Sequence, residues 1–93
     1  MGEQRPKWKI YFHRDAEKAL KKLPKEVVER VWEKIRTLES DPRPAGCKKL
    51  QGRYDNHYRI RVGNWRISYV VEEDVLIILV FEIAPRGGAY RNL

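Results

Sequence analysis

Cysteine is nearly absent from this sequence, because Cys47 is the one cysteine in 93 residues. A single thiol cannot form an internal disulfide or a cysteine metal cluster, which indicates either a reducing compartment or a protein indifferent to redox conditions, and we expect the cytoplasm. Long apolar runs are also missing. The longest, from Val75 to Phe81, is far shorter than the roughly 18 residues that span a bilayer. The N-terminus has no apolar signal core, and we therefore expect neither export nor membrane insertion.

The sequence also lacks the motifs of several enzyme classes. Its two histidines, His13 and His57, lie far apart, and the three adjacent acids at 72–74 are typical of a solvated turn. A serine triad is not indicated, because neither Ser40 nor Ser68 has a supporting arrangement of histidine and aspartate. No phosphate-binding loop or dinucleotide fingerprint is present. We therefore expect no metal and no cofactor.

Positive charge is abundant and unevenly distributed. Lys and Arg number 20 against 13 Asp and Glu, which gives a net charge of +7, and a pI of about 9.8 suggests a polyanionic partner. An acidic protein partner would explain the same charge. All nine lysines lie between Lys7 and Lys49, whereas every cation after residue 50 is an arginine. Arginine alone favours forked contacts to phosphate or carboxylate, although chance composition explains the bias equally well.

The length and the 42% hydrophobic content predict one α+β domain over residues 1–93, since a single domain usually has roughly 100 to 150 residues. Alternating residues 8–12 predict a strand. A first helix is expected over Asp15–Leu23, with the aspartate as its N-cap. Apolar residues at spacings of three and four predict a second helix over Lys25–Ser40. The prolines of segment 41–46 then end the helical half.

Three strands are expected in the second half of the chain. The segments His57 to Val62 and Trp65 to Val71 flank a Gly-Asn pair that is typical of a two-residue hairpin turn. The nearly continuous apolar run from Val75 to Ile83 predicts a strand covered on both faces. The order β-α-α-β-β-β therefore predicts an N-terminal helical hairpin packed on a mainly antiparallel four-stranded sheet.

The expected hairpin register gathers arginines on one face of the sheet. A two-residue loop places Arg61 opposite Arg66 and Arg59 opposite Ser68, while the other face is wholly apolar. Side-chain bases of directly opposed residues lie about 4.5 to 5.5 Å apart, so the two opposed arginines repel each other. Either solvent screens this repulsion or the face holds an anion. Arg86 joins this face if the final strand continues its alternation.

A face of guanidinium groups with a tyrosine hydroxyl, without metal or carboxylate, suits one covalent reaction, the cleavage of RNA by its own 2′-hydroxyl. Arginines can orient the RNA backbone and neutralise the charge that develops on the phosphate. Proton transfer is the difficulty, because unperturbed arginine titrates above about 12 and tyrosine near 10. Tyr90 is the candidate hydroxyl, with a C-terminal core anchor as its alternative role. These groups imply a slow or externally assisted enzyme.

Several stretches resemble toxins of the RelE/ParE superfamily from prokaryotic toxin–antitoxin pairs. They are KKLP, DPRPAGCKKLQG, YRIRVGNWRISYVV and PRGGAYR, of which the third is the most specific. The resemblance covers nearly the whole chain and implies a RelE-like toxin domain. In the RelE branch it further implies a ribosome-dependent endonuclease that cleaves mRNA in the A site by 2′-hydroxyl attack, without a metal.

The resemblance implies roles for individual residues. Arg59 and Arg61 match the basic pair before the hairpin turn, which binds phosphate and assists the base, and Arg66 matches a transition-state contact. Arg86 corresponds to an arginine that stabilises phosphate or protonates the leaving group. Tyr90 corresponds to a tyrosine that stacks on a base or takes the proton. The residues predicted to bind RNA are Lys48, Lys49, Arg53 and Arg91.

The resemblance also implies partners. They are a RelB-like antitoxin with acidic contact segments, the ribosome and mRNA, with no membrane involved. A ParE-like inhibitor of DNA gyrase on the same fold is the alternative function, and an inactive relative is a third possibility. The presence of both Arg86 and Tyr90 favours RNA cleavage.

Overall fold

The helices and strands follow the order expected from the sequence, with one additional strand. The computed structural model describes residues 8–50 and 56–85. The elements in these ranges are β1 Lys9–Phe12, α1 Arg14–Lys21, α2 Lys25–Thr37, β2 Lys48–Lys49, β3 His57–Val62, β4 Trp65–Glu72 and β5 Ile77–Pro85.

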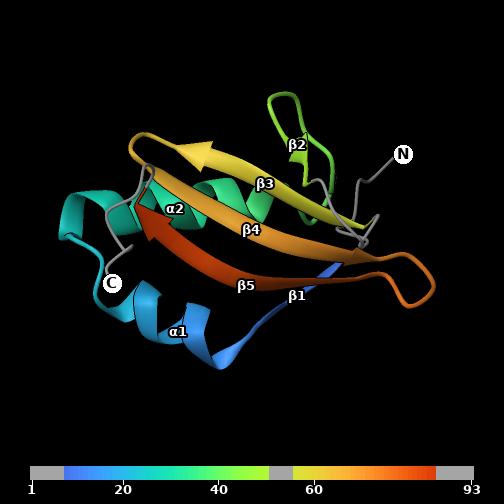
Figure 1. Cartoon of the computed structure of the whole chain (residues 1–93), viewed down its shortest axis with the longest axis horizontal. Coiled ribbons are helices and arrows are strands. Elements are labelled where there is room, and N and C mark those ends of the chain that lie inside the picture. The colour runs from blue at the N-terminus through green and yellow to red at the C-terminus, as the bar shows by residue number, and fades with distance from the viewer. Residues whose placement is uncertain (1–7, 51–55, 86–93) are drawn as a thin grey trace, which may run out of the picture.

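All the strands form one sheet with the order β1-β5-β4-β3-β2 (Figure 1). The short β1 runs parallel to β5, and the other neighbouring pairs are antiparallel. The prediction of a mainly antiparallel α+β sheet is confirmed, but the expected count of four strands was wrong. Lys48 and Lys49 form a fifth strand, because they pair with Arg59 and Tyr58 at the edge of β3.

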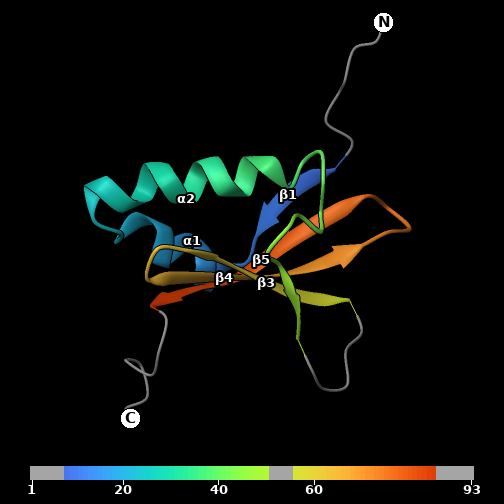
Figure 2. The ribbon, with the colours of Figure 1, turned by 90° about the horizontal axis from the view of Figure 1, so that it is seen from above.

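The helices lie on one side of the sheet (Figure 2). Within the described ranges, the opposite side carries no helix, so the outward side chains of β3, β4 and β5 form an open face. Within residues 8–50 and 56–85, neither helix is long and apolar enough to cross a membrane.

The core lies between α2 and the inner face of the sheet. Val31 and Ile35 of α2 are 0% and 1% exposed, and they belong to the same buried cluster as Ile60, Ile67 and Tyr69 of the sheet. Burying one such aliphatic side chain stabilises a fold by about 1.5 to 3 kcal/mol. The alternation predicted for the hairpin strands therefore gives the sheet the apolar face on which the helices pack.

Several element boundaries differ from the sequence prediction, and three of the differences have a clear structural cause. The N-cap of α1 is His13, whose ring Nδ1 accepts the backbone N–H of Asp15 at 3.1 Å, so the prediction of Asp15 as the cap was wrong. Helix α2 ends at Thr37, because Leu38 donates its N–H to a carbonyl only three residues back and the chain turns. Strand β5 begins after Leu76, whose φ of 56° completes the preceding turn.

Candidate functional site

The open face of the β3–β4 hairpin carries three arginines, Arg59, Arg61 and Arg66, which we call the arginine face. The observed register pairs Arg61 with Arg66 and Arg59 with Ser68, as the two-residue turn predicted. Residues paired in this way point to the same side of the sheet. Ile60 and Ile67 point to the other side, where they are 1% and 0% exposed. The hairpin therefore places its arginines on the face opposite these buried isoleucines.

A carboxylate lies among these arginines. Oε1 of Glu82 lies 3.8 Å from Nε of Arg66 and accepts a hydrogen bond from the Ser68 hydroxyl at 3.0 Å. The side chain of Arg66 is only 19% exposed, so this ion pair is partly shielded from solvent. The expectation of a face without a carboxylate was wrong. A single acid inside an otherwise apolar strand was the sequence signal that could have revealed Glu82.

A β-bulge brings Glu82 to this position. The β4–β5 register shifts between Ser68 and Tyr69, so that Tyr69 pairs with Val80 whereas Ser68 pairs with Glu82. The turn at 73–76 sets the pairs from Glu72 with Ile77 to Tyr69 with Val80. If this register continued, Phe81 would lie opposite Ser68. Bulges re-aim side chains in this way, and here the bulge brings the Glu82 carboxylate opposite Ser68, beside the arginines.

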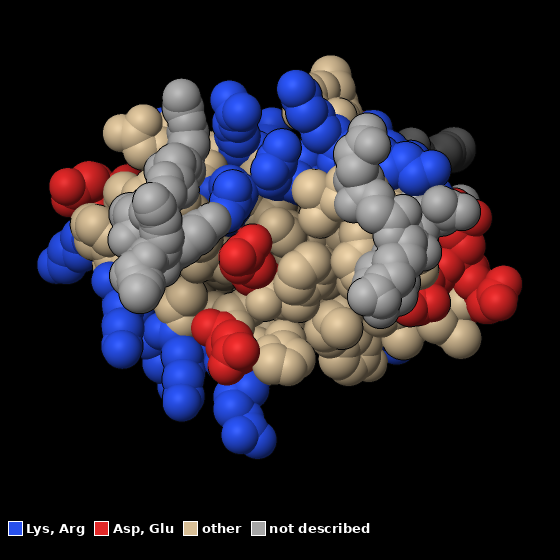
Figure 3. All heavy atoms as spheres, in the orientation of Figure 1, with Lys and Arg blue, Asp and Glu red and all other residues tan. Residues whose placement is uncertain are grey.

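Strand β2 extends the positive charge to the edge of the sheet. Lys48 is the register partner of Arg59 and so lies on the open face, whereas Lys49 is the partner of Tyr58, on the opposite face. Both lysines are exposed. A row of side chains therefore crosses four strands in the order Lys48, Arg59, Ser68 and Glu82. In the space-filling view, Lys and Arg atoms gather along this β2–β3 edge (Figure 3).

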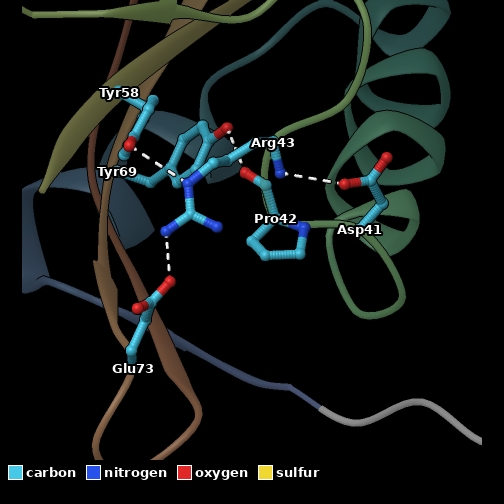
Figure 4. A network of polar contacts seen from close by, with 6 residues as sticks. All are labelled: Asp41, Pro42, Arg43, Tyr58, Tyr69 and Glu73. Atoms are coloured by element: carbon cyan, nitrogen blue, oxygen red, sulfur yellow. Dashed lines mark hydrogen bonds and ion pairs between the residues drawn. The ribbon is translucent and has the colours of Figure 1, made fainter.

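Arg43 fixes the connector that leads from α2 to β2 (Figure 4). Its Nε donates to the Tyr58 hydroxyl at 3.1 Å, its guanidinium also pairs with Glu73, and its backbone N–H donates to Asp41 at 3.1 Å. The bonds to Tyr58 and Glu73 raise the pKa of Arg43 above its ordinary value. The turn at 72–74 is therefore more than the solvated turn expected from its sequence, because one of its acids anchors this connector.

Tyr69 is the second anchor of the connector. Its hydroxyl, in the core, donates to the Pro42 carbonyl at 2.7 Å, and its ring stacks on Tyr58 with 6.0 Å between centroids. Burial raises the pKa of Tyr69 above its ordinary value. Together with Arg43, this bond fixes where the connector meets the sheet, and so places Lys48 beside Arg59. The sequence reasoning missed both anchors, because they join segments 27 and 30 positions apart.

The structure brings together part of the predicted site. Arg59, Arg61, Arg66 and Lys48 share the open face. Of the other predicted residues, Lys49 lies on the opposite face, and Arg53, Arg86, Tyr90 and Arg91 lie outside the described residues. In the part of the chain that is described, no cluster of three or more His, Cys, Asp or Glu residues could hold a metal ion. The chemistry that the described face offers is the binding and charge neutralisation of an anion.

Comparisons with known proteins identify relatives. A family model described as the ParE toxin of type II toxin–antitoxin system, parDE, matches residues 10–90. The RelE1 protein of Methanocaldococcus jannaschii is 38% identical over 89 residues, which cover 92% of this chain and 98% of that protein. A chain of the archaeal RelE–RelB complex from Pyrococcus horikoshii superposes with a TM-score of 0.78 at 33% identity, covering 87% of this chain and 97% of that one. A chain of the RelB–RelE antitoxin–toxin complex from Methanococcus jannaschii gives a TM-score of 0.70 at 29% identity, covering 89% and 98%.

Proposed function

Since this chain belongs to the RelE/ParE superfamily of toxins from type II toxin–antitoxin systems, we propose that it cleaves mRNA in the ribosomal A site. The substrate's 2′-hydroxyl is the nucleophile, and no metal takes part. The observation that carries this proposal is the arginine face, on which Arg61 and Arg66 are direct cross-strand partners and Arg59 lies one row away. A cationic face that helices leave open can receive an RNA strand that the ribosome presents.

The proposed reaction transfers the phosphorus from one oxygen of the RNA to another. The 2′-oxygen bonds to the adjacent phosphorus and loses its proton, while the bond to the 5′-oxygen breaks and that oxygen gains a proton. Negative charge grows on the non-bridging oxygens in between. Arg61 and Arg66 are proposed to neutralise it with charge-assisted hydrogen bonds. Glu82 is a positioning residue, because its carboxylate holds the Arg66 side chain by the 3.8 Å ion pair.

Two further groups belong to the proposal although they lie outside the described residues. Arg86 is proposed to stabilise the phosphate or to protonate the leaving 5′-oxygen. Tyr90 is proposed to stack on a base or to take the proton of the 2′-hydroxyl. Strand β5 ends at Pro85, the register partner of Trp65.

Primer extension on mRNA translated in a purified system tests the proposal. The intact protein should produce cuts that need ribosomes, and Arg66→Gln or Arg86→Ala should lower their rate about 10²-fold or more, as removal of one transition-state donor typically does. Lys18→Gln is the matched control, because it removes one exposed positive charge from α1. The absence of ribosome-dependent cuts with the intact protein would contradict the proposal.

Inhibition of DNA gyrase is the second candidate function. It is favoured by the match of residues 10–90 to the ParE family model. On this reading the fold is a binding module, and the arginine face need not react with RNA. A supercoiling assay with purified gyrase decides between the two. Only the second candidate requires the protein to inhibit gyrase when ribosomes are absent.

A RelB-like antitoxin is the proposed partner that controls the toxin. Relatives at 33% and 29% identity come from complexes whose names pair RelE with RelB. The net charge of +7 suits an antitoxin with acidic contact segments as well as ribosomal RNA. The ribosome as target would place the action of this toxin in the cytoplasm.

A further inference from the structure

A second cationic site lies beside the arginine face, between α2 and the β3–β4 turn. The cleft there has a volume of about 370 Å³ and is lined by cations from both walls. Arg30 and Lys34 come from α2, and Arg61 comes from β3. This volume falls in the lower part of the roughly 300 to 1,000 Å³ range that is typical of ligand pockets. The cleft therefore has room for a group of nucleotide size.

The cations of the cleft are held close together at an electrostatic cost. Arg30 and Lys34 are four residues apart on α2, a spacing that places side chains side by side, and like charges there destabilise a helix. Neither residue forms an ion pair with any other residue of the described ranges. Glu33 also lines the cleft, which leaves the lining with a surplus of positive charge. Such a surplus on facing walls favours an anionic occupant.

The turn is built to let Arg30 approach it. Gly63 has a φ of +59°, and a Cβ atom at this position would lie 3.1 Å from Nη2 of Arg30. Glycine thus serves both the left-handed backbone of the turn and the close approach of the guanidinium. Thr37, which also lines the cleft, donates its hydroxyl hydrogen to the Lys34 carbonyl at 2.6 Å. The cationic side chains are consequently the anion-binding groups of this cleft.

Arg61 joins the cleft to the arginine face. It lines the cleft and is also the cross-strand partner of Arg66. From these positions we infer that the cleft binds backbone phosphates of the same RNA strand whose scissile phosphate lies on the arginine face. A flexible strand with one charge per nucleotide can follow cations from the face around the hairpin turn to α2. The inference rests on the proposed function for the identity of the ligand.

Salt-dependent RNA binding tests the inference. The probe is a fluorescent 20-nucleotide 2′-O-methyl RNA, which cannot be cleaved by a 2′-hydroxyl, and the readout is anisotropy between 50 and 200 mM salt. Arg30→Gln and Lys34→Gln should each weaken binding and reduce the slope of log Kd against log salt by about 0.7, the value for one phosphate contact on a single strand. The ratio of the variant Kd to the wild-type Kd should therefore be about 2.6-fold smaller at 200 mM salt than at 50 mM salt.

Control variants separate binding from folding. Arg30→Lys and Lys34→Arg keep the charge and should restore the wild-type slope, whereas Lys18→Gln removes an equal charge from exposed α1 and should leave the slope unchanged. If Arg30→Gln and Lys34→Gln behave like Lys18→Gln, the inference is wrong. It is also wrong if these two variants lose affinity for the antitoxin and keep it for RNA, because the occupant would then be an acidic protein.

The outcomes for the cleft and for the reaction are distinguishable. Ribosome-dependent cuts by the wild type together with unchanged RNA binding in the Arg30 and Lys34 variants would overturn the cleft and support the reaction. Weakened RNA binding in these variants, with no cuts by the wild type, would support the cleft and overturn the reaction.

Discussion

Replacing Arg61 with glutamine should stabilise the isolated protein and weaken its binding to RNA. Arg61 is exposed, is the cross-strand partner of Arg66, and shares the cleft with Arg30 and Lys34. Without a bound anion, these contacts are repulsive. Glutamine keeps much of the side-chain stem and removes the charge, so the main change is the loss of repulsion.

The size of the effect follows from the register. Like charges directly opposite each other on adjacent strands, with side-chain bases about 4.5 to 5.5 Å apart, cost about 0.2 to 1 kcal/mol. Glu82, 3.8 Å from Arg66, offsets part of this repulsion, which favours the lower half of that range. For a domain of roughly 60 to 100 residues, the full range corresponds to a rise in Tm of about 1 to 8 °C.

Thermal unfolding followed by circular dichroism at about 0.01 M and 1 M salt is the appropriate assay. The Debye length falls from about 30 Å to about 3 Å between these conditions. The Tm of Arg61→Gln should therefore exceed that of the wild type at low salt and match it at high salt. Arg61→Lys keeps the charge and should match the wild type at both concentrations.

An unchanged or lower Tm for Arg61→Gln at low salt would refute this reasoning. Such a result would mean that solvent already screens the arginines, so that the face stores no repulsion for an anion to relieve. A rise in Tm that persists at 1 M salt would refute it as well, because the gain would then not be electrostatic.

Three further predictions concern stability. Tyr69→Phe removes the hydrogen bond to the buried Pro42 carbonyl and should lower the free energy of unfolding by about 1 to 3 kcal/mol in urea titrations at pH 7. Because the folded-state pKa of Tyr69 is raised, the contribution of Tyr69 to stability should be constant below about pH 10 and be lost as the pH rises from there through the folded value, a loss that the phenylalanine variant should not share. Gly63→Ala should cost roughly 1 to 2 kcal/mol, because its φ of +59° is left-handed and the added Cβ crowds Arg30; equal stability would contradict the described turn. Glu82→Gln should lower the Tm at low salt and tighten RNA binding. A higher Tm together with weaker RNA binding would show that the carboxylate does not offset the repulsion among the arginines.

Local sequence was sufficient to place the arginine face. The Gly-Asn turn between β3 and β4 is two residues long, so it determines every pair of the hairpin, from Val62 with Trp65 to Tyr58 with Tyr69. Because side chains alternate along a strand, the same register separates Arg59 and Arg61 from the apolar face. The predicted apolar stripe of α2 is confirmed for a related reason, since helical periodicity is also a local property.

Only the tertiary structure decided what lies around that face. Ile78, Val80 and Ile83 all point to the core, which requires a change of alternation that a continuous apolar run does not reveal. The bulge that makes this change also brings Glu82 opposite Ser68. The packing that sets such a register joins segments distant in the chain, so no local pattern encodes it.

The same distinction holds for strand β2 and for the cleft between α2 and the β3–β4 turn. Lys48 reaches the arginine face because Arg43 and Tyr69 anchor the connector to the sheet, and the cleft exists because α2 packs where Arg30 meets the hairpin turn. The sequence by itself determined which arginines share a face, through turn length and alternation. Packing between distant segments decided which carboxylate, which lysine and which helix cations stand beside them.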